Sequence, residues 1–263
     1  MTSLFVQSQG EGPDLVLLHG WGMHAGIWHD VVARLQRRFR LHCVDLPGHG
    51  RSPLGDTAFT LGTVVQQVVD ALQARLDRAH WLGWSLGGMV ATQLAQQHAG
   101  LVKSLSLVAC NLRFCRSEDW PCAMSPEVLQ KFADNLTHHP EQTLQRFLAL
   151  QVSRDGSGRA QLRQLRQQVF DGKPPQVSAL QGGLQILRSA DLRALAAQVQ
   201  QPVWLLGGGQ DRLVPPEAQD RIAALFPQAE VHCMAKAGHA PFVADGARFV
   251  GLLEDFLQHA EHD

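Results

Sequence analysis

A serine lies inside a short motif bounded by glycines, Gly83-Trp84-Ser85-Leu86-Gly87. Apolar residues precede the motif and a helix-like stretch follows it, which predicts a sharp turn between a strand and a helix. Such a turn lifts the serine hydroxyl out of the sheet, where a base can take its proton and make it a nucleophile. The motif by itself does not establish an active site, since glycine and serine are common in loops.

A serine nucleophile needs a histidine that takes its proton and a carboxylate that orients this histidine. Folds with this kind of serine turn carry the three residues in the order Ser, Asp or Glu, His. Asp211 follows an apolar run that is typical of a strand, and His239 lies in a glycine-marked loop after the next such run. Each of the two could be an ordinary loop residue when taken singly. Their order and positions together predict Ser85, Asp211 and His239 as the catalytic residues.

Three other histidines follow Asp211 and fit the role of the base less well. His232 lies inside an expected strand, where a partly buried structural histidine is the simpler interpretation. His259 and His262 belong to the last helix and the tail. These positions leave His239 as the predicted base.

The negative charge that develops on the carbonyl oxygen requires backbone N–H donors. Leu86, directly after the serine, supplies one of them. The motif His19-Gly20-Trp21-Gly22 follows the first long apolar run, and its glycines allow the backbone to approach a substrate. We therefore expect the N–H of Trp21 to be the second donor and His19 to be an orienting residue. A simple turn at the end of a strand is the alternative for this motif.

Short apolar runs predict the strands that position these residues. They span residues 15–18, 41–44, 80–82, 104–108, 203–206 and 231–234, and helix-like stretches span 61–76, 89–98, 216–225 and 247–259. The alternation of strands and helices predicts an α/β fold with a mostly parallel, doubly wound sheet. Ligand sites in such sheets lie beyond the carboxyl ends of the strands, where the predicted catalytic residues are placed.

The alternation stops over residues 112–187, which we call the lid segment. Prolines and glycines divide this stretch into several helix-like parts. A structureless loop of this length is uncommon in a compact domain. We therefore expect a helical lid inserted into a core that consists of residues 1–111 and 188–263.

Composition argues against a nucleic-acid-binding, a secreted and a membrane-spanning protein. A chain of 263 residues with 45% hydrophobic residues can bury a large core, and its net charge of -1 gives no general attraction to nucleic acid or to acidic membranes. The N-terminus lacks the features of a secretion signal, and no apolar run approaches the roughly 20 residues of a membrane span. We expect a cytoplasmic monomer without a nucleic-acid or membrane partner.

The cysteines do not indicate a metal site or a disulfide framework. The chain has five cysteines, an odd number, and none of them forms a C-x-x-C pair. Cys110, Cys115 and Cys122 lie close in sequence, but zinc would need a fourth ligand and tighter spacing. We expect reduced thiols and neither a metal nor an organic cofactor.

The motifs resemble the α/β-hydrolase superfamily along nearly the whole chain. They are His19-Gly20-Trp21-Gly22, Asp45-Leu46-Pro47-Gly48-His49-Gly50-Arg51-Ser52, the serine motif, Asp211 and Gly238-His239. The resemblance implies an α/β-hydrolase fold, but this fold hosts many substrates. A serine nucleophile argues against epoxide hydrolases and dehalogenases, which need an aspartate that forms an ester intermediate.

Further segments resemble a narrower family, the pimeloyl-[acyl-carrier protein] methyl ester esterases of biotin synthesis. These segments are residues 17–23, 81–88, 146–151, 182–187 and 235–242. Residues 146–151, Arg-Phe-Leu-Ala-Leu-Gln, discriminate best because they lie in the variable lid. Enzymes of that family remove a methyl group from a seven-carbon dicarboxylate thioester on acyl carrier protein. The resemblance implies this reaction, with a substrate site lined by Trp21, Ser85, Leu86, Phe147, Leu148, Ala149, Leu150 and Gln151.

The lid segment carries an excess of arginine. Residues 142–170 contain Arg146, Arg154, Arg159, Arg163 and Arg166 against one acid, Asp155, which gives a local charge of +4. Flanking Glu141 and Asp171 reduce this local charge to +2. The excess stands out because the whole chain has a net charge of only -1.

Three of these arginines share one face of an expected helix. Arg159, Arg163 and Arg166 follow the i, i+4, i+7 spacing, and an acidic carrier protein would be attracted to such a face. The alternative is a solvated helix surface without a partner. The family resemblance implies carrier contacts by Arg146, Arg159 and Arg163, whereas Gln142 stands where a further arginine is expected.

Two alternatives to this function stay open at the level of sequence. The first is a carboxylesterase with broad specificity for short-chain esters, for which the arginines would be irrelevant. The second is a ligand-binding relative without catalysis. Such relatives often lose a catalytic residue or an oxyanion-loop glycine, and this chain keeps the full set.

Overall fold

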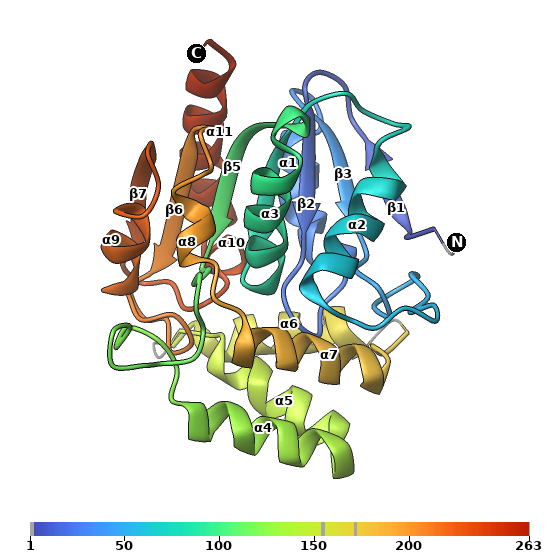
Figure 1. Ribbon diagram of the computed structural model, residues 1–263, viewed down its shortest axis with the longest axis vertical. Helices are drawn as coiled ribbons and strands as arrows, with labels where there is room; N and C mark the ends of the chain where they lie inside the picture. Colours follow the sequence, from blue (N-terminus) through green and yellow to red (C-terminus); the bar gives the residue numbers. More distant parts are fainter. Residues whose placement is uncertain (1–2, 154–155, 171–172, 263) are drawn as a thin grey trace.

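A computed structural model describes residues 3–153, 156–170 and 173–262. Within these ranges the chain forms a seven-stranded sheet in the order β1-β3-β2-β4-β5-β6-β7 (Figure 1). The strands are β1 (Val6–Gln9), β2 (Asp14–Leu18), β3 (Arg40–Val44), β4 (Ala79–Trp84), β5 (Val102–Val108), β6 (Val203–Gly208) and β7 (Ala229–Met234). β1 pairs with β3 in the antiparallel sense and the other pairs are parallel. The predicted α/β class with a mostly parallel sheet is confirmed.

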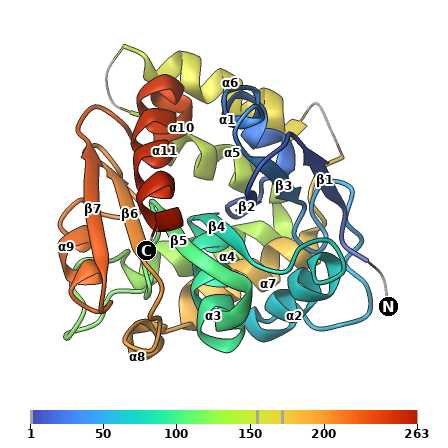
Figure 2. The same ribbon diagram turned by 90° about the horizontal axis from the view of Figure 1, so that it is seen from above.

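Helices cover both faces of the sheet. Figure 2 shows α1 (His29–Leu35) and α11 (Gly246–His262) on one face, and α2 (Leu61–Leu72), α3 (Leu86–Gln97) and α8 (Arg193–Ala196) on the other. β4 and β6 are buried along their whole length, as expected for central parallel strands. The short helices α9 (Ala218–Ala223) and α10 (Pro241–Ala244) follow β6 and β7.

The lid segment contains helices that lie together at one end of the sheet (Figure 1). They are α4 (Pro126–His138), α5 (Pro140–Leu150), α6 (Gly158–Phe170) and α7 (Val177–Ser189). Pro126 and Pro140 occupy the first helical positions of α4 and α5, where the missing N–H costs no hydrogen bond. These prolines therefore begin helices as well as separating them.

Several elements have no counterpart in the sequence prediction, among them the strand β1 and the helix α1. β1 has the sequence Val-Gln-Ser-Gln and lies at the edge of the sheet, where its residues are only partly buried. It therefore lacks the apolar run by which the other strands were predicted. α1 has only seven residues and follows a 3-10 turn, Ala25–Trp28, so its helical periodicity is too short to stand out.

Candidate active site

Ser85 occupies the turn between β4 and α3. β4 ends at Trp84 and α3 begins at Leu86, so the serine is the single residue between them. Its φ of 55° lies in the left-handed region, which is strained for a residue with a side chain. The Ser85 N–H donates to the carbonyl of Val108 on the neighbouring strand at 2.9 Å, which helps to hold this conformation.

Two glycines of the motif are required by close backbone contacts. A Cβ added to Gly83 would lie 2.4 Å from the carbonyl oxygen of Gly87, and one added to Gly87 would lie 2.4 Å from that of Leu18. Both distances are shorter than the 3.0 Å below which Cβ atoms essentially never approach another heavy atom. Larger residues would therefore push α3 away from the sheet and displace the serine between them.

The structure brings Ser85, His239 and Asp211 together in one chain of hydrogen bonds. His239 Nε2 lies 2.9 Å from Ser85 Oγ, and His239 Nδ1 lies 2.7 Å from Asp211 Oδ2. The other carboxylate oxygen of Asp211 accepts hydrogen bonds from two backbone N–H groups, at 2.8 and 3.0 Å. With its proton on Nδ1 facing the carboxylate, the imidazole presents an unprotonated Nε2 to the serine hydroxyl. This arrangement can activate the serine as a nucleophile.

The backbone of His239 is held by both the core and the lid segment. Its N–H donates to the carbonyl of Gln151 at 2.8 Å, and its carbonyl accepts from the indole Nε1 of Trp84 at 2.7 Å. Trp84 also packs edge-on against Phe242, with ring centroids 5.0 Å apart. The base is therefore fixed in position by contacts beyond its two catalytic partners.

The predicted oxyanion donors, the N–H groups of Trp21 and Leu86, are buried and available. Neither makes a hydrogen bond within the described part of the chain, and both residues are almost fully inaccessible. Buried backbone N–H groups without a partner are rare in folded proteins. A pair of them next to the serine can bind the oxygen of a substrate carbonyl.

His19 orients the loop that carries Trp21. Its Nδ1 donates to the carbonyl of Gly20 at 2.8 Å and its Nε2 accepts from the N–H of Leu46 at 2.9 Å. Burial, together with neighbouring His49, holds the pKa of His19 well below its usual value. A neutral imidazole with both nitrogens engaged is an orienting group, as expected from the sequence.

The loop that begins at Asp45 supports the same region. One carboxylate oxygen of Asp45 accepts from the N–H of Ala25 at 2.6 Å and the other accepts from that of Arg51 at 2.8 Å. His49, in the same loop, donates from Nδ1 to the carbonyl of Pro47 at 2.9 Å. Burial lowers the pKa of His49 to about 4, and its Nε2 has no partner within the described residues.

The residues of the predicted substrate stretch take different positions. The rings of Phe147 and Trp21 meet edge-on with centroids 4.7 Å apart. Gln151 is 1% exposed, and its Oε1 is buried without a hydrogen-bond partner in the described structure. Leu148 is fully buried in the core and Leu150 packs at its edge. The structure thus places Phe147 beside the predicted oxyanion donor Trp21 and Gln151 beside His239, whereas the two leucines contribute to packing.

Ala149, the remaining residue of this stretch, links the lid segment to the core through its backbone. Its carbonyl accepts a hydrogen bond from the guanidinium of Arg212. Arg212 directly follows Asp211, so this bond ties α5 to the loop that carries the carboxylate. The side chain of Ala149 is partly buried.

The predicted carrier-binding arginines lie on two lid helices and point to solvent. Arg146 belongs to α5, and Arg159 and Arg163 belong to α6; all three are exposed and form no ion pair with any described residue. Leu165 and Val169 occupy the buried face of α6. Of the other charges counted in the lid segment, Arg154, Asp155 and Asp171 lie outside the described residues.

Metal-binding clusters and membrane-spanning helices were also sought. The described ranges contain no group of three or more side chains that could hold a metal ion. Over the same ranges, no helix is long and apolar enough to cross a membrane. The five cysteines are free.

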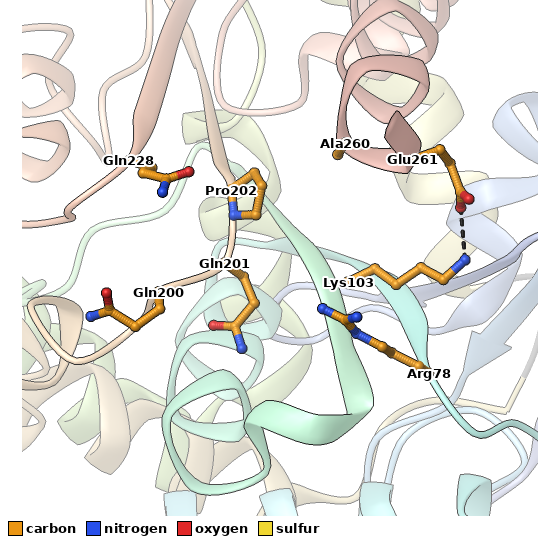
Figure 3. Close-up of a pocket in the computed structure, with 8 residues that line it drawn as sticks. All are labelled: Arg78, Lys103, Gln200, Gln201, Pro202, Gln228, Ala260 and Glu261. Atoms are coloured by element: carbon orange, nitrogen blue, oxygen red, sulfur yellow. Dashed lines mark hydrogen bonds and ion pairs between the residues drawn. The ribbon is translucent and has the colours of Figure 1, made fainter. Parts of the chain in front are cut away.

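A cavity lies at the end of the sheet opposite Ser85 (Figure 3). It has a volume of about 450 Å³, and Arg78, Lys103, Gln201 and Glu261 are among its lining residues. Lys103 stands near the start of β5 and forms an ion pair with Glu261 at 2.8 Å. The cavity thus lies at the amino ends of the strands, opposite Ser85, and no serine, threonine or cysteine is among its lining residues.

Sequence reasoning assigned no role to some residues that support the site. The indole of Trp84 and the guanidinium of Arg212 adjoin predicted catalytic residues in sequence, and this adjacency was the available signal. The carbonyl of Leu180, which accepts from Trp21 Nε1 at 2.8 Å, gave no signal. Any residue can supply a backbone carbonyl, so residue type does not reveal this role.

Comparisons with known proteins agree with this geometry. The model of the alpha/beta hydrolase family matches residues 15–252. A pimeloyl-[acyl-carrier protein] methyl ester esterase from Nitrosomonas europaea is 43% identical over 97% of this chain and 99% of its own length. A protein of the same name from Serratia marcescens is 43% identical over 98% of this chain and 99% of its own length.

Solved structures show the same fold at lower sequence identity. An esterase from Exiguobacterium antarcticum has a TM-score of 0.89 at 20% identity and covers 98% of this chain and 96% of its own. A bromoperoxidase from Bacillus anthracis has a TM-score of 0.88 at 17% identity, with coverage of 97% and 95%. These structural likenesses establish the fold. The relatives at 43% identity identify the narrower family within it. The chain belongs to the α/β-hydrolase family and, within it, to the pimeloyl-[acyl-carrier protein] methyl ester esterases.

Proposed function

We propose that this protein is a serine carboxylesterase that hydrolyses the methyl ester of pimeloyl-[acyl-carrier protein] in biotin biosynthesis. The products are pimeloyl-[acyl-carrier protein] and methanol. The hydrogen-bonded chain from Ser85 through His239 to Asp211 carries the proposal for the chemistry. Full-length relatives at 43% identity that bear this enzyme name carry the proposal for the substrate.

In the proposed mechanism, Ser85 Oγ attacks the ester carbonyl while His239 Nε2 takes the hydroxyl proton. The N–H groups of Trp21 and Leu86 bind the resulting oxyanion, and Asp211 stabilises the imidazolium. The bond to the methoxy group then breaks, and His239 gives its proton to the leaving oxygen to form methanol. A water molecule, deprotonated by His239, attacks the acyl-enzyme and releases the free carboxylate.

We also propose that residues 112–187 act as a lid over a core of residues 1–111 and 188–263. The side chains of Ser85 and His239 are almost completely buried, and α5 and α7 pack against the predicted oxyanion residue Trp21. A substrate reaches the serine through a narrow opening or after a movement of the lid. Phe147, Leu148, Ala149, Leu150 and Gln151 would then belong to the acyl site.

The carrier protein is proposed to dock on the arginines of this lid. Arg146, Arg159 and Arg163 are exposed and free of ion pairs within the described ranges, so they are available to an acidic partner. Charges at the rim of an interface act mainly on association rate and orientation. The arginines would therefore bring the carrier to the lid and aim its acyl chain at the serine.

The central test is hydrolysis of the purified carrier-bound methyl ester. We expect the protein to release methanol, with a larger kcat/KM than for free dimethyl pimelate, and Ser85→Ala to release it about 10⁴-fold more slowly or less. Equal kcat/KM values for the two esters would instead indicate a broad-specificity carboxylesterase. Rescue of a biotin auxotroph that lacks its esterase tests the same function in cells, and the Ser85→Ala gene is the matched control.

A further inference from the structure

One helix of the lid segment lies directly on both predicted oxyanion donors. Gly183, in the middle of α7, is the point of closest approach. A Cβ added there would lie 2.7 Å from Trp21 Cδ1, 3.2 Å from Trp21 Nε1 and 3.3 Å from Leu86 Cδ2. Three residues earlier in the same helix, the carbonyl of Leu180 accepts a hydrogen bond from Trp21 Nε1 at 2.8 Å.

We propose that Gly183 is a positioning residue for the oxyanion hole. Its missing side chain lets α7 pack against the side chains of Trp21 and Leu86, and this contact sets the direction of the two backbone N–H groups. The proposal rests on the proposed roles of Trp21 and Leu86 as oxyanion donors. It adds that the lid helix takes part in the chemical step, beyond any contact with the substrate.

Further contacts hold α7 close to the core at its start and next to Gly183. At the start of α7, the N–H of Gln176 donates to the carbonyl of Gly48 at 2.9 Å. Next to Gly183, a Cβ added to Gly182 would lie only 2.5 Å from Phe59 Cβ, so the helix also presses against the core there. We therefore expect a methyl group at position 183 to displace its neighbours in the active site.

Trp21 takes most of this displacement. The Leu86 contact involves the end of a flexible side chain, whereas the Trp21 contact involves a rigid indole ring near its attachment point. Two other contacts also confine the indole: the edge-on packing of Phe147 and the hydrogen bond from Nε1 to the Leu180 carbonyl. Because the confined ring has little room to rotate about its side-chain bonds, we expect its shift to move the backbone N–H of the same residue.

The test is Gly183→Ala, assayed with p-nitrophenyl acetate, a small ester that makes no use of a carrier. We expect kcat to fall by about tenfold to a hundredfold, because loss of one complete oxyanion donor costs about 10² to 10³ in rate. We expect KM to change by less than about twofold, since the substrate ground state makes little use of the hole. Near-ultraviolet circular dichroism measures the folded fraction, to which the rates are normalised.

Gly251→Ala is the matched control. Gly251 lies within α11 and has no atom within 4 Å of an added Cβ, so the same helical substitution meets nothing there. We expect its kcat to equal that of the wild type. A normalised kcat for Gly183→Ala within twofold of the Gly251→Ala value would overturn the proposal, as would a rise in KM with kcat unchanged.

A double-mutant cycle with Trp21→Phe separates positioning from general packing. The phenyl ring is smaller than the indole and lacks Nε1, so the added methyl group displaces residue 21 less. We expect Gly183→Ala to cost a smaller factor in kcat in this background than in the wild type. Equal factors in the two backgrounds would overturn the proposal. Failure of the wild type to hydrolyse any ester would instead contradict the proposed function.

Discussion

The sheet core and the lid segment hold their functional residues in different ways. In the core, backbone hydrogen bonds and close glycine contacts fix Ser85 between β4 and α3, and neighbouring ionisable groups such as His19 are buried and neutral. In the lid segment, the predicted carrier-binding residues are arginines on exposed helix faces. Substitutions of catalytic residues and changes of pH should therefore act on the core. Salt and the charge of the partner should act on the lid segment.

Two hydrogen bonds join the lid segment to predicted active-site residues of the core. α7 reaches Trp21 through the Leu180 carbonyl, and the end of α5 reaches His239 through the Gln151 carbonyl. Both contacts use backbone carbonyls of the lid segment, which any residue type could supply. The lid helices can thus vary in sequence for substrate recognition while they keep hold of the catalytic centre. This explains how one fold can combine common chemistry with different substrates.

The largest expected effect comes from removing the nucleophile. Ser85→Ala should reduce kcat/KM for both the carrier-bound ester and p-nitrophenyl acetate by about 10⁴-fold or more, because no other group can form the acyl-enzyme. Steady-state hydrolysis of the two esters measures this loss, and thermal unfolding checks that the fold is intact. If either ester were still hydrolysed at the wild-type rate, the serine mechanism would be wrong.

A pH effect on stability should come from the buried core histidines. The pKa of His49 is about 4 in the folded protein and 6.5 for an ordinary histidine, so the unfolded chain binds a proton that the folded chain excludes. Stability is therefore full above pH 6.5 and falls as the pH drops towards 4. At about 1.4 kcal/mol per pH unit, His49 should cost about 2 kcal/mol between pH 6.5 and 5.0.

Urea unfolding at pH 7.5 and at pH 5.0 measures this dependence. His49→Gln keeps a hydrogen-bond donor without a titrating group, so its free energy of unfolding should fall less on acidification than that of the wild type. His29→Gln is the control, because the side chain of His29 is 80% exposed. An unchanged slope in His49→Gln would show that His49 is not kept neutral by burial.

The lid arginines should produce a smaller effect that depends on salt. Replacement of both Arg159 and Arg163 by alanine should lower kcat/KM for the carrier-bound ester about tenfold at low ionic strength, mainly through slower association. The loss should shrink as salt is added, because exposed charges are screened. Hydrolysis of p-nitrophenyl acetate should stay unchanged. Equal rates with the carrier-bound ester at low salt would contradict carrier docking on α6.

The smallest effect should come from the side-chain link between the two regions. Arg212→Ala removes the hydrogen bond to the Ala149 carbonyl, and an exposed bond of this kind contributes about 0.5 to 1.5 kcal/mol. We expect a severalfold increase in the rate of limited proteolysis within the lid segment and a change in kcat of less than about threefold. Arg221→Ala, on the exposed surface of α9, is the control. Identical cleavage rates in the two variants would show that Arg212 does not hold the lid.

Much of the core could be predicted because its signals are local. The runs at 15–18 and 203–206 are apolar along their whole length, as parallel strands buried on both faces must be. β1 was not predicted because an edge strand needs no such apolar run. α1 was not predicted because seven residues show too little helical periodicity. The monomeric state and the cytoplasmic location stay predictions, as do the catalytic and carrier-binding roles of individual residues.

The sequence by itself determined the serine turn, the order and identity of Ser85, Asp211 and His239, and the parallel sheet beneath them. These features depend on residue types within short stretches and on chain order. Only the tertiary structure decided that Leu180 meets Trp21 across 159 positions of the chain, and that Gly183 lies against both predicted oxyanion donors. Contacts of this kind depend on how separate helices pack in space. A backbone carbonyl leaves no pattern in the sequence, and a glycine within a helix does not show which residues the helix packs against there.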